Sequence, residues 1–187
     1  VMNSDAPIRT FLAVYPDPAT QIRLTELTAR LRTRLGSVRW SPDHQLHFTL
    51  RFFGDLGAAD RAKVEAVLAA AAPAIEPVAF PLSGLGAFPD WTRARVLWAG
   101  AGAGREALEA IAARLDVLFE TAGLSRADRP FRAHLTLARL KDGERLSPAA
   151  AATLQNEVFT TPPLNVGELR LMGSALGRGG ATHTTLG

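Results

Sequence analysis

Two histidines in this chain share a local pattern that suits acid–base chemistry. His47 and His134 each open the sequence His-x-Thr-Leu, and the two copies lie 87 residues apart in a chain with only four histidines. An imidazole exchanges its proton near neutral pH, and a threonine hydroxyl can donate a hydrogen bond to an anionic oxygen. The repeated pattern therefore indicates a site that holds an anionic group between two imidazoles.

Both copies lie in segments typical of β-strands. Because side chains alternate along a strand, His47 shares a face with Thr49, and His134 shares a face with Thr136. If two halves of the chain face each other, these four side chains surround one small volume. A phosphodiester fits such a site, since one imidazole can take a proton from water while the other gives one to the departing oxygen. No metal or other cofactor is needed for this chemistry.

The remaining histidines are weaker candidates. His183 also precedes x-Thr-Leu, but it follows a glycine-rich stretch (177–180) near the end of the chain, where packing is the simpler interpretation. His44 lies three residues before His47 and would point to the opposite side of a regular strand. The chain has no cysteine, and no carboxylate cluster accompanies this pair, so we expect no metal centre.

The elements that must position these residues mix strands and helices without a strict βαβ order. Hydrophobic patterns predict strands at 8–14, 46–53, 78–82, 95–99, 131–140, 164–172 and 181–186, and helices at 18–35, 60–72, 104–121 and 148–155. This order predicts an α+β protein with antiparallel sheets, folded as a single domain over residues 1–187. A strand–helix theme in both halves suggests an internal duplication.

Composition narrows the setting and the partners. The 187 residues include no cysteine, which excludes a disulfide scaffold and a cysteine nucleophile. Lys and Arg number 21 against 18 acidic residues, and nearly all of the basic residues are arginine, which forms forked contacts to phosphate. No apolar run is long enough to span a membrane, and residues 1–7 lack the features of a signal peptide. We therefore expect a cytoplasmic monomer that does not bind membranes.

At these residues the sequence resembles the 2H phosphoesterase superfamily. More narrowly, it resembles the RNA 2′,3′-cyclic phosphodiesterases historically called 2′-5′ RNA ligases. The resemblance rests on both His-x-Thr-Leu copies with the residues that follow them, and on the segments 9–13, 84–89, 95–100 and 171–176. It implies a bilobal α+β fold, with two antiparallel sheets, flanking helices and pseudo-twofold symmetry around a central cleft that carries both motifs.

The resemblance also implies an activity. It implies hydrolysis of RNA 2′,3′-cyclic phosphate ends to 2′-phosphomonoesters without a metal, and reversible joining of RNA ends through a 2′-5′ linkage. His47 would donate a proton to the leaving 3′ oxygen, and His134 would activate water. Thr49 and Thr136 would bind the phosphate. The substrate partner would be an RNA end or a cyclic nucleotide.

Further residues follow from the same resemblance. Arg139 matches a phosphate-binding arginine, but it lies five residues after His134, so a bulge or a strand end is needed to turn it toward the site. Alternation alone favours Arg51 or Arg132, and Arg51 would suit the phosphate of a flanking nucleotide. Phe11 would either stack on a base or pack in the core, and Trp98 is expected to be a packing anchor.

Two positions depart from the family pattern. Ala133 stands where relatives commonly have proline, and we expect this change to loosen the entry into the following strand. His183 stands where relatives usually carry an aromatic residue, which adds a titratable group near the end of the chain.

Two other functions fit the same residues. The site could act on a small cyclic nucleotide such as ADP-ribose 1″,2″-cyclic phosphate, or the chain could be a non-catalytic RNA-binding module. Intact Thr49 and Thr136 beside both histidines argue against the module, because a site that had lost catalysis would tolerate their loss.

Overall fold

The computed structural model describes residues 6–35, 38–166, 168–177 and 180–186. Its strands are β1 (Ile8–Val14), β2 (Val38–Trp40), β3 (Phe48–Leu56), β4 (Val78–Phe80), β5 (Leu82–Phe88), β6 (Val96–Ala101), β7 (His134–Leu140), β8 (Leu164–Val166), β9 (Arg170–Gly177) and β10 (Gly180–Thr185). Its helices are α1 (Pro18–Arg32), α2 (Ala58–Ala71), α3 (Arg105–Thr121) and α4 (Pro148–Gln155). Arg178 and Gly179, in the glycine-rich stretch before His183, lie outside the described residues.

The α+β prediction with antiparallel sheets is confirmed, and the two sheets are very unequal. The large sheet has the order β10-β9-β1-β3-β7-β6-β5, with β2 also paired to β7, and the small sheet pairs β4 with β8. The segment predicted as one strand at 164–172 is therefore divided between the two sheets. The short strand β2 was not predicted, because three residues carry too little periodicity to indicate a strand.

Local sequence signals account for the helix ends. α1 begins at Pro18, directly after Asp17, whose carboxylate accepts a hydrogen bond from the backbone amide of Thr20 at 2.8 Å. α4 begins in the same way at Pro148, after the capping residue Ser147. Proline suits the first helical position because its missing amide proton would have no partner there.

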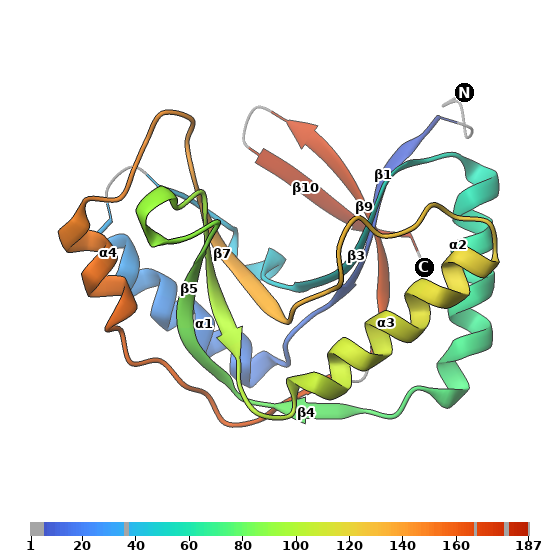
Figure 1. Cartoon of the computed structure of the whole chain (residues 1–187), viewed down its shortest axis with the longest axis horizontal. Helices are drawn as coiled ribbons and strands as arrows, with labels where there is room; N and C mark the ends of the chain where they lie inside the picture. Colours follow the sequence, from blue (N-terminus) through green and yellow to red (C-terminus); the bar gives the residue numbers. More distant parts are fainter. Residues whose placement is uncertain (1–5, 36–37, 167, 178–179, 187) are drawn as a thin grey trace.

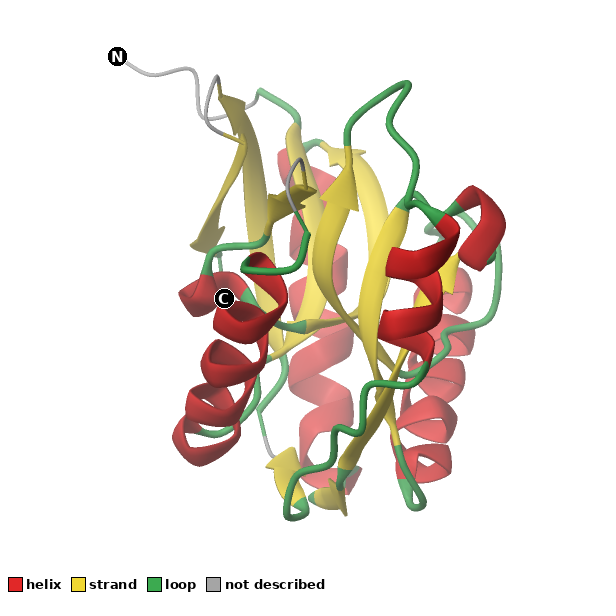
Figure 2. Ribbon diagram, turned by 90° about the vertical axis from the view of Figure 1, so that its left-hand side faces the viewer, coloured by secondary structure: helices red, strands yellow, loops and turns green. Residues whose placement is uncertain are grey.

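The helices lie on the outer side of a sheet whose two halves diverge. Figure 1 shows α1 and α4 beside the half that contains β5 and β7, and α2 and α3 beside the half that contains β1 and β3. Figure 2 shows the strands passing between the helices in a turned view. Fully buried Phe48, Phe80 and Phe119 belong to the core between sheet and helices. Among the described residues, no helix combines the length and hydropathy needed to cross a membrane.

The two halves of the large sheet meet at β3 and β7. In the described part of the chain these strands share one pair of backbone partners, Phe48 and Leu135, and both side chains are completely shielded from solvent. Each of these residues directly follows a motif histidine. The junction of the halves is therefore also the place where the two motifs meet.

Candidate active site

The junction brings both motifs to one face of the sheet. His47 directly precedes β3, and His134 is the first residue of β7. Because Phe48 pairs with Leu135 in an antiparallel register, the neighbouring positions place His47 across from Thr136 and His134 across from Thr49. We call this side of the sheet the motif face.

Both histidines are held in the same way. The Nδ1 of His47 lies 2.6 Å from the carbonyl oxygen of Gln45, and the Nδ1 of His134 lies 2.6 Å from the carbonyl oxygen of Arg132. A carbonyl oxygen can only accept, so Nδ1 carries the proton and donates it in both rings. In the neutral imidazole, Nε2 then presents a lone pair. The Nε2 of His47 accepts a hydrogen bond from the hydroxyl of Thr49 at 3.0 Å.

A β-bulge in β7 turns Arg139 toward the motif face. In the pairing with β6, Leu137 is left unmatched between Thr136 and Ala138. Leu137 and Ala138 are consequently both buried, and the exposed Arg139 returns to the side that carries His134. The sequence predicts a bulge or a strand end that turns Arg139 toward the site, and the structure shows the bulge.

The charge of Arg139 acts on both imidazoles. The pKa of His47 is lowered from 6.5 to about 4: burial is the main cause, the Gln45 carbonyl opposes it, and the charges of His183 and Arg139 contribute to the lowering. Burial also lowers the pKa of His134, again with a contribution from Arg139. One guanidinium therefore lies close enough to both rings to affect their protonation. Without a bound anion, both imidazoles are neutral at pH 7.

Aromatic rings enclose His47 on several sides. Phe11 stacks on the imidazole with ring centroids 5.1 Å apart, Tyr15 lies at 5.4 Å, and His183 meets the ring edge-on at 5.3 Å. Phe11 is only 3% exposed, so it supports His47 from behind and has no open face for a base. His183 is a wall of the site, which its position near the end of the chain did not indicate.

A second aromatic wall stands beside His134. Phe88 meets the imidazole edge-on at 4.9 Å, and Trp98 lies at 6.2 Å. The indole of Trp98 lies over Gly86, where an added Cβ would sit 2.0 Å from the ring. Sequence reasoning missed Phe88 and assigned Trp98 to packing. The available signal was a glycine and two aromatic residues in the segments that form β5 and β6, but using it required knowing that β5 pairs with β6 and β6 with the motif strand β7.

The structure corrects the alternative role considered for Arg51. Its side chain is 6% exposed, it forms an ion pair with Asp116 at 2.6 Å, and it also donates to the carbonyl oxygen of Ser125. A guanidinium held in this way cannot reach the phosphate of a flanking nucleotide. The cause is a bulge at Leu50, which turns Arg51 away from the motif face.

The same bulge brings Phe52 to the motif face. Phe52 pairs with Phe11, which packs under His47, and 49% of Phe52 is exposed. The guanidinium carbon of Arg9 lies 4.6 Å from the centre of the Phe52 ring. Sequence reasoning missed this residue, because its side of the sheet depends on the bulge.

The strand entry at Ala133 is anchored. Its backbone amide donates a hydrogen bond to the carboxylate of Glu109 in α3 at 2.9 Å. A proline at this position has no amide proton and could not make this bond. The expected loosening is therefore not what the structure shows.

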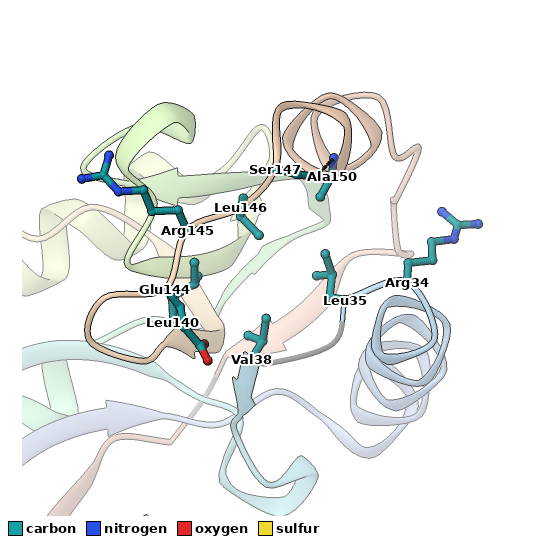
Figure 3. Close-up of a pocket in the computed structure, with 9 residues that line it drawn as sticks. All are labelled: Arg34, Leu35, Val38, Leu140, Glu144, Arg145, Leu146, Ser147 and Ala150. Carbon is teal, nitrogen blue, oxygen red and sulfur yellow. Dashed lines mark hydrogen bonds between the residues drawn. The ribbon is translucent and has the colours of Figure 1, made fainter.

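A separate cavity of about 300 Å³ lies on the opposite side of β7 (Figure 3). Val38 and Leu140 line it, together with Glu144, whose carboxylate lies between them in Figure 3. No motif residue lines this cavity. Within the residues that the structure describes, no group of three or more side chains of the metal-ligating types is found.

Comparisons with known proteins show what this chain is similar to. The family model described as the 2′-5′ RNA ligase superfamily matches residues 13–178. A protein named RNA 2′,3′-cyclic phosphodiesterase from Methanothermobacter thermautotrophicus is 28% identical over 179 residues, covering 96% of both chains. A protein of the same name from Aeropyrum pernix is 32% identical over 144 residues, covering 77% of this chain and 81% of the relative.

Solved structures show the same fold. The crystal structure of TT0787 from Thermus thermophilus superposes with a TM-score of 0.72 at 27% identity, covering 96% of each chain. The crystal structure of E. coli LigT complexed with 3′-AMP superposes with a TM-score of 0.71 at 23% identity, covering 97% of this chain and 96% of that one.

Proposed function

This chain belongs to the 2′-5′ RNA ligase superfamily, and we propose that it hydrolyses RNA 2′,3′-cyclic phosphate ends to 2′-phosphomonoesters, with His47 and His134 as its acid and base. The observation that carries the proposal is the single pairing of Phe48 with Leu135, which sets both motifs on one face around the charge of Arg139. The names of the curated relatives support a cyclic phosphodiesterase activity.

The site offers each group that such a hydrolysis requires. The Nε2 lone pair of His134 can accept a proton from water as the water attacks phosphorus. Nε2 of His47, once protonated, can donate to the leaving 3′ oxygen. Thr49, Thr136 and Arg139 can hold the non-bridging oxygens, on which negative charge increases in the transition state. If the 5′-hydroxyl of a second RNA replaces water as the nucleophile, the P–O3′ bond breaks in the same way and the product is a 2′-5′ linkage.

Because the pKa of His47 is low in the free protein, His47 must gain a proton when the substrate binds before it can act as an acid. An acid must carry a proton, and a group with a pKa of about 4 is almost fully neutral at pH 7 in the free protein. A bound phosphodiester brings a negative charge next to the ring and neutralises the effect of Arg139. Both changes raise the pKa of His47, so substrate binding is expected to take up a proton.

The central experiment measures hydrolysis of a short RNA with a 2′,3′-cyclic phosphate end by wild type, His47→Ala and His134→Ala. We expect the wild type to yield a 2′-phosphomonoester and each variant to lose at least about 100-fold in kcat, which is the lower range for a lost general acid or base. Turnover should be unchanged by EDTA.

Two matched measurements make the result decisive. His44→Ala removes a neighbouring histidine outside the motifs and should retain wild-type kcat. Hydrolysis that persists in both motif variants would contradict the two-histidine mechanism, and binding of RNA without turnover in the wild type would favour a non-catalytic module.

A further inference from the structure

Two arginines lie directly opposite each other beside the proposed site. In the antiparallel pairing of β2 with β7, Arg39 is the partner of Arg139. Partners in this position have their side chains on the same face, with Cα atoms about 4.5 to 5.5 Å apart. Arg39 therefore stands next to the guanidinium that acts on both catalytic imidazoles.

The neighbouring pairs show which face this is. Val38 pairs with Leu140, and both line the cavity on the opposite side of β7 (Figure 3). Trp40, on the other side of Arg39, packs against the core. Because side chains alternate along a strand, Arg39 between them points to the motif face.

Arg39 is exposed and forms no hydrogen bond or ion pair with any residue that the structure describes. Two arginines in the segment before β2 do have acidic partners: Arg32 lies 3.4 Å from Asp43, and Arg34 lies 2.9 Å from Glu157. Like charges directly across a strand pair destabilise a sheet. The pair Arg39–Arg139 thus has a cost in the free protein that a bound polyanion would remove.

We propose that Arg39 binds the phosphate on the 5′ side of the terminal ribose, next to the scissile cyclic phosphate, and so makes the enzyme prefer an RNA end to a nucleoside cyclic phosphate. This inference rests on the proposed function. When Arg139 holds the cyclic phosphate on the 2′ and 3′ oxygens, the next phosphate is attached to the 5′ oxygen of the same ribose. One sugar separates the two phosphates, and one strand spacing separates the two arginines. A forked guanidinium suits such a contact.

The test compares substrates that differ only in this phosphate. Adenosine 2′,3′-cyclic phosphate lacks it, its 5′-phosphorylated form carries it, and the dinucleotide ApA with a 2′,3′-cyclic phosphate end carries it as an internucleotide linkage. The variants are Arg39→Ala, Arg39→Lys and a control, Arg23→Ala, which removes an equal charge from an exposed position on α1. Thermal unfolding verifies that each variant is folded.

We expect Arg39→Ala to lower kcat/KM about tenfold on both substrates that carry the phosphate and to leave the unphosphorylated nucleoside cyclic phosphate unchanged. Arg39→Lys should lose less, and Arg23→Ala should behave as wild type. The slope of log kcat/KM against log salt on the dinucleotide should become shallower by about 0.7 in Arg39→Ala, as one phosphate contact is lost.

Two outcomes would overturn the inference: no change on any substrate, or an equal loss on all three, which would assign Arg39 to the scissile phosphate or to structure. Failure of the wild type to hydrolyse any of the three would instead refute the proposed function. In that case binding of adenosine 2′-phosphate with and without a 5′-phosphate decides the role of Arg39, because Arg39→Ala should weaken binding only of the ligand that carries the 5′-phosphate.

Discussion

The segments 47–52 and 134–139 use one backbone device to different ends. In each, the histidine Nδ1 donates to the carbonyl oxygen two residues earlier at 2.6 Å. In each, the leucine that follows the threonine is the extra residue of a bulge and is buried. The leucine of His-x-Thr-Leu is thus explained by the core, and the histidine and threonine by the site.

The segments differ in what the bulge delivers to the motif face. Five residues after the histidine, the first segment presents the exposed ring of Phe52 and the second presents the charge of Arg139. Arg51, the one arginine of the first segment, is instead buried against Asp116. Matching backbones therefore do not imply matching side chains: one segment presents a positive charge on the motif face, and the other presents apolar surface.

The largest effect is expected on kcat, from substitution of Arg139, the charged residue that the second segment presents. Arg139→Ala should lower kcat on cyclic-phosphate RNA by about 10² to 10³, because it removes a donor to oxygens that gain charge in the transition state. The free energy of unfolding should change by less than about 0.5 kcal/mol, since Arg139 is exposed. Steady-state kinetics and urea titration measure the two quantities, and a loss in stability with kcat intact would reverse the assignment.

The arginine of the first segment should behave in the opposite way. Arg51→Met leaves the carboxylate of Asp116 without its partner, and we expect the free energy of unfolding to fall by about 3 kcal/mol. Folded protein should keep kcat within about threefold. The double variant Arg51→Met with Asp116→Leu should recover most of the lost stability in urea titrations, because it removes the unpaired carboxylate as well. A further loss of stability in the double variant would contradict this explanation.

Protonation of His47 should link stability to pH. Its pKa is about 4 in the folded protein and near 6.5 when unfolded, so the unfolded chain binds a proton that the folded protein does not. Stability is therefore lost as pH falls from about 6.5 to about 4, by about 3 kcal/mol from this group alone. The difference in unfolding free energy between wild type and His47→Gln, measured at pH 7 and pH 4.5, isolates this contribution. Parallel pH dependences would show that His47 is not shielded as described.

The smallest effect is expected from substitution of Phe52, the apolar residue that the first segment presents. Phe52→Ala should lower kcat/KM on RNA about tenfold, since an exposed ring on the motif face can stack on a base. A cyclic-phosphate substrate with an abasic terminal sugar should be hydrolysed equally by wild type and variant. An equal loss on both substrates would make Phe52 a packing residue.

The sequence was sufficient to predict which motif side chains lie together because the motifs are local. A histidine and a threonine two positions apart share a face in any extended segment, so Thr49 and Thr136 could be placed without knowing the fold. The elements carrying them were also predicted, although His47 itself lies just before β3. The bulges were not predictable, because a bulge is defined by the partner strand.

Residues whose roles depend on distant partners were beyond sequence reasoning. Arg51 meets Asp116 across 65 positions, and Trp98 reaches His134 only because β6 pairs with β7. His183 adjoins His47 through the path β10-β9-β1-β3, which no local pattern indicates. Local pattern thus predicted the candidate residues of the two motifs, and the tertiary fold determined their neighbours.

The single pair of backbone partners between β3 and β7 has a consequence for how this protein can change over evolutionary time. The halves are otherwise held together by one hydrophobic core that spans both of them, so small changes in core packing can alter how they are oriented about this seam. A slight pivot about the seam would alter the gap between the two Nε2 atoms without touching either motif. Substitutions that retune the reaction are therefore expected in the packing between helices and sheet, far from any group that contacts RNA.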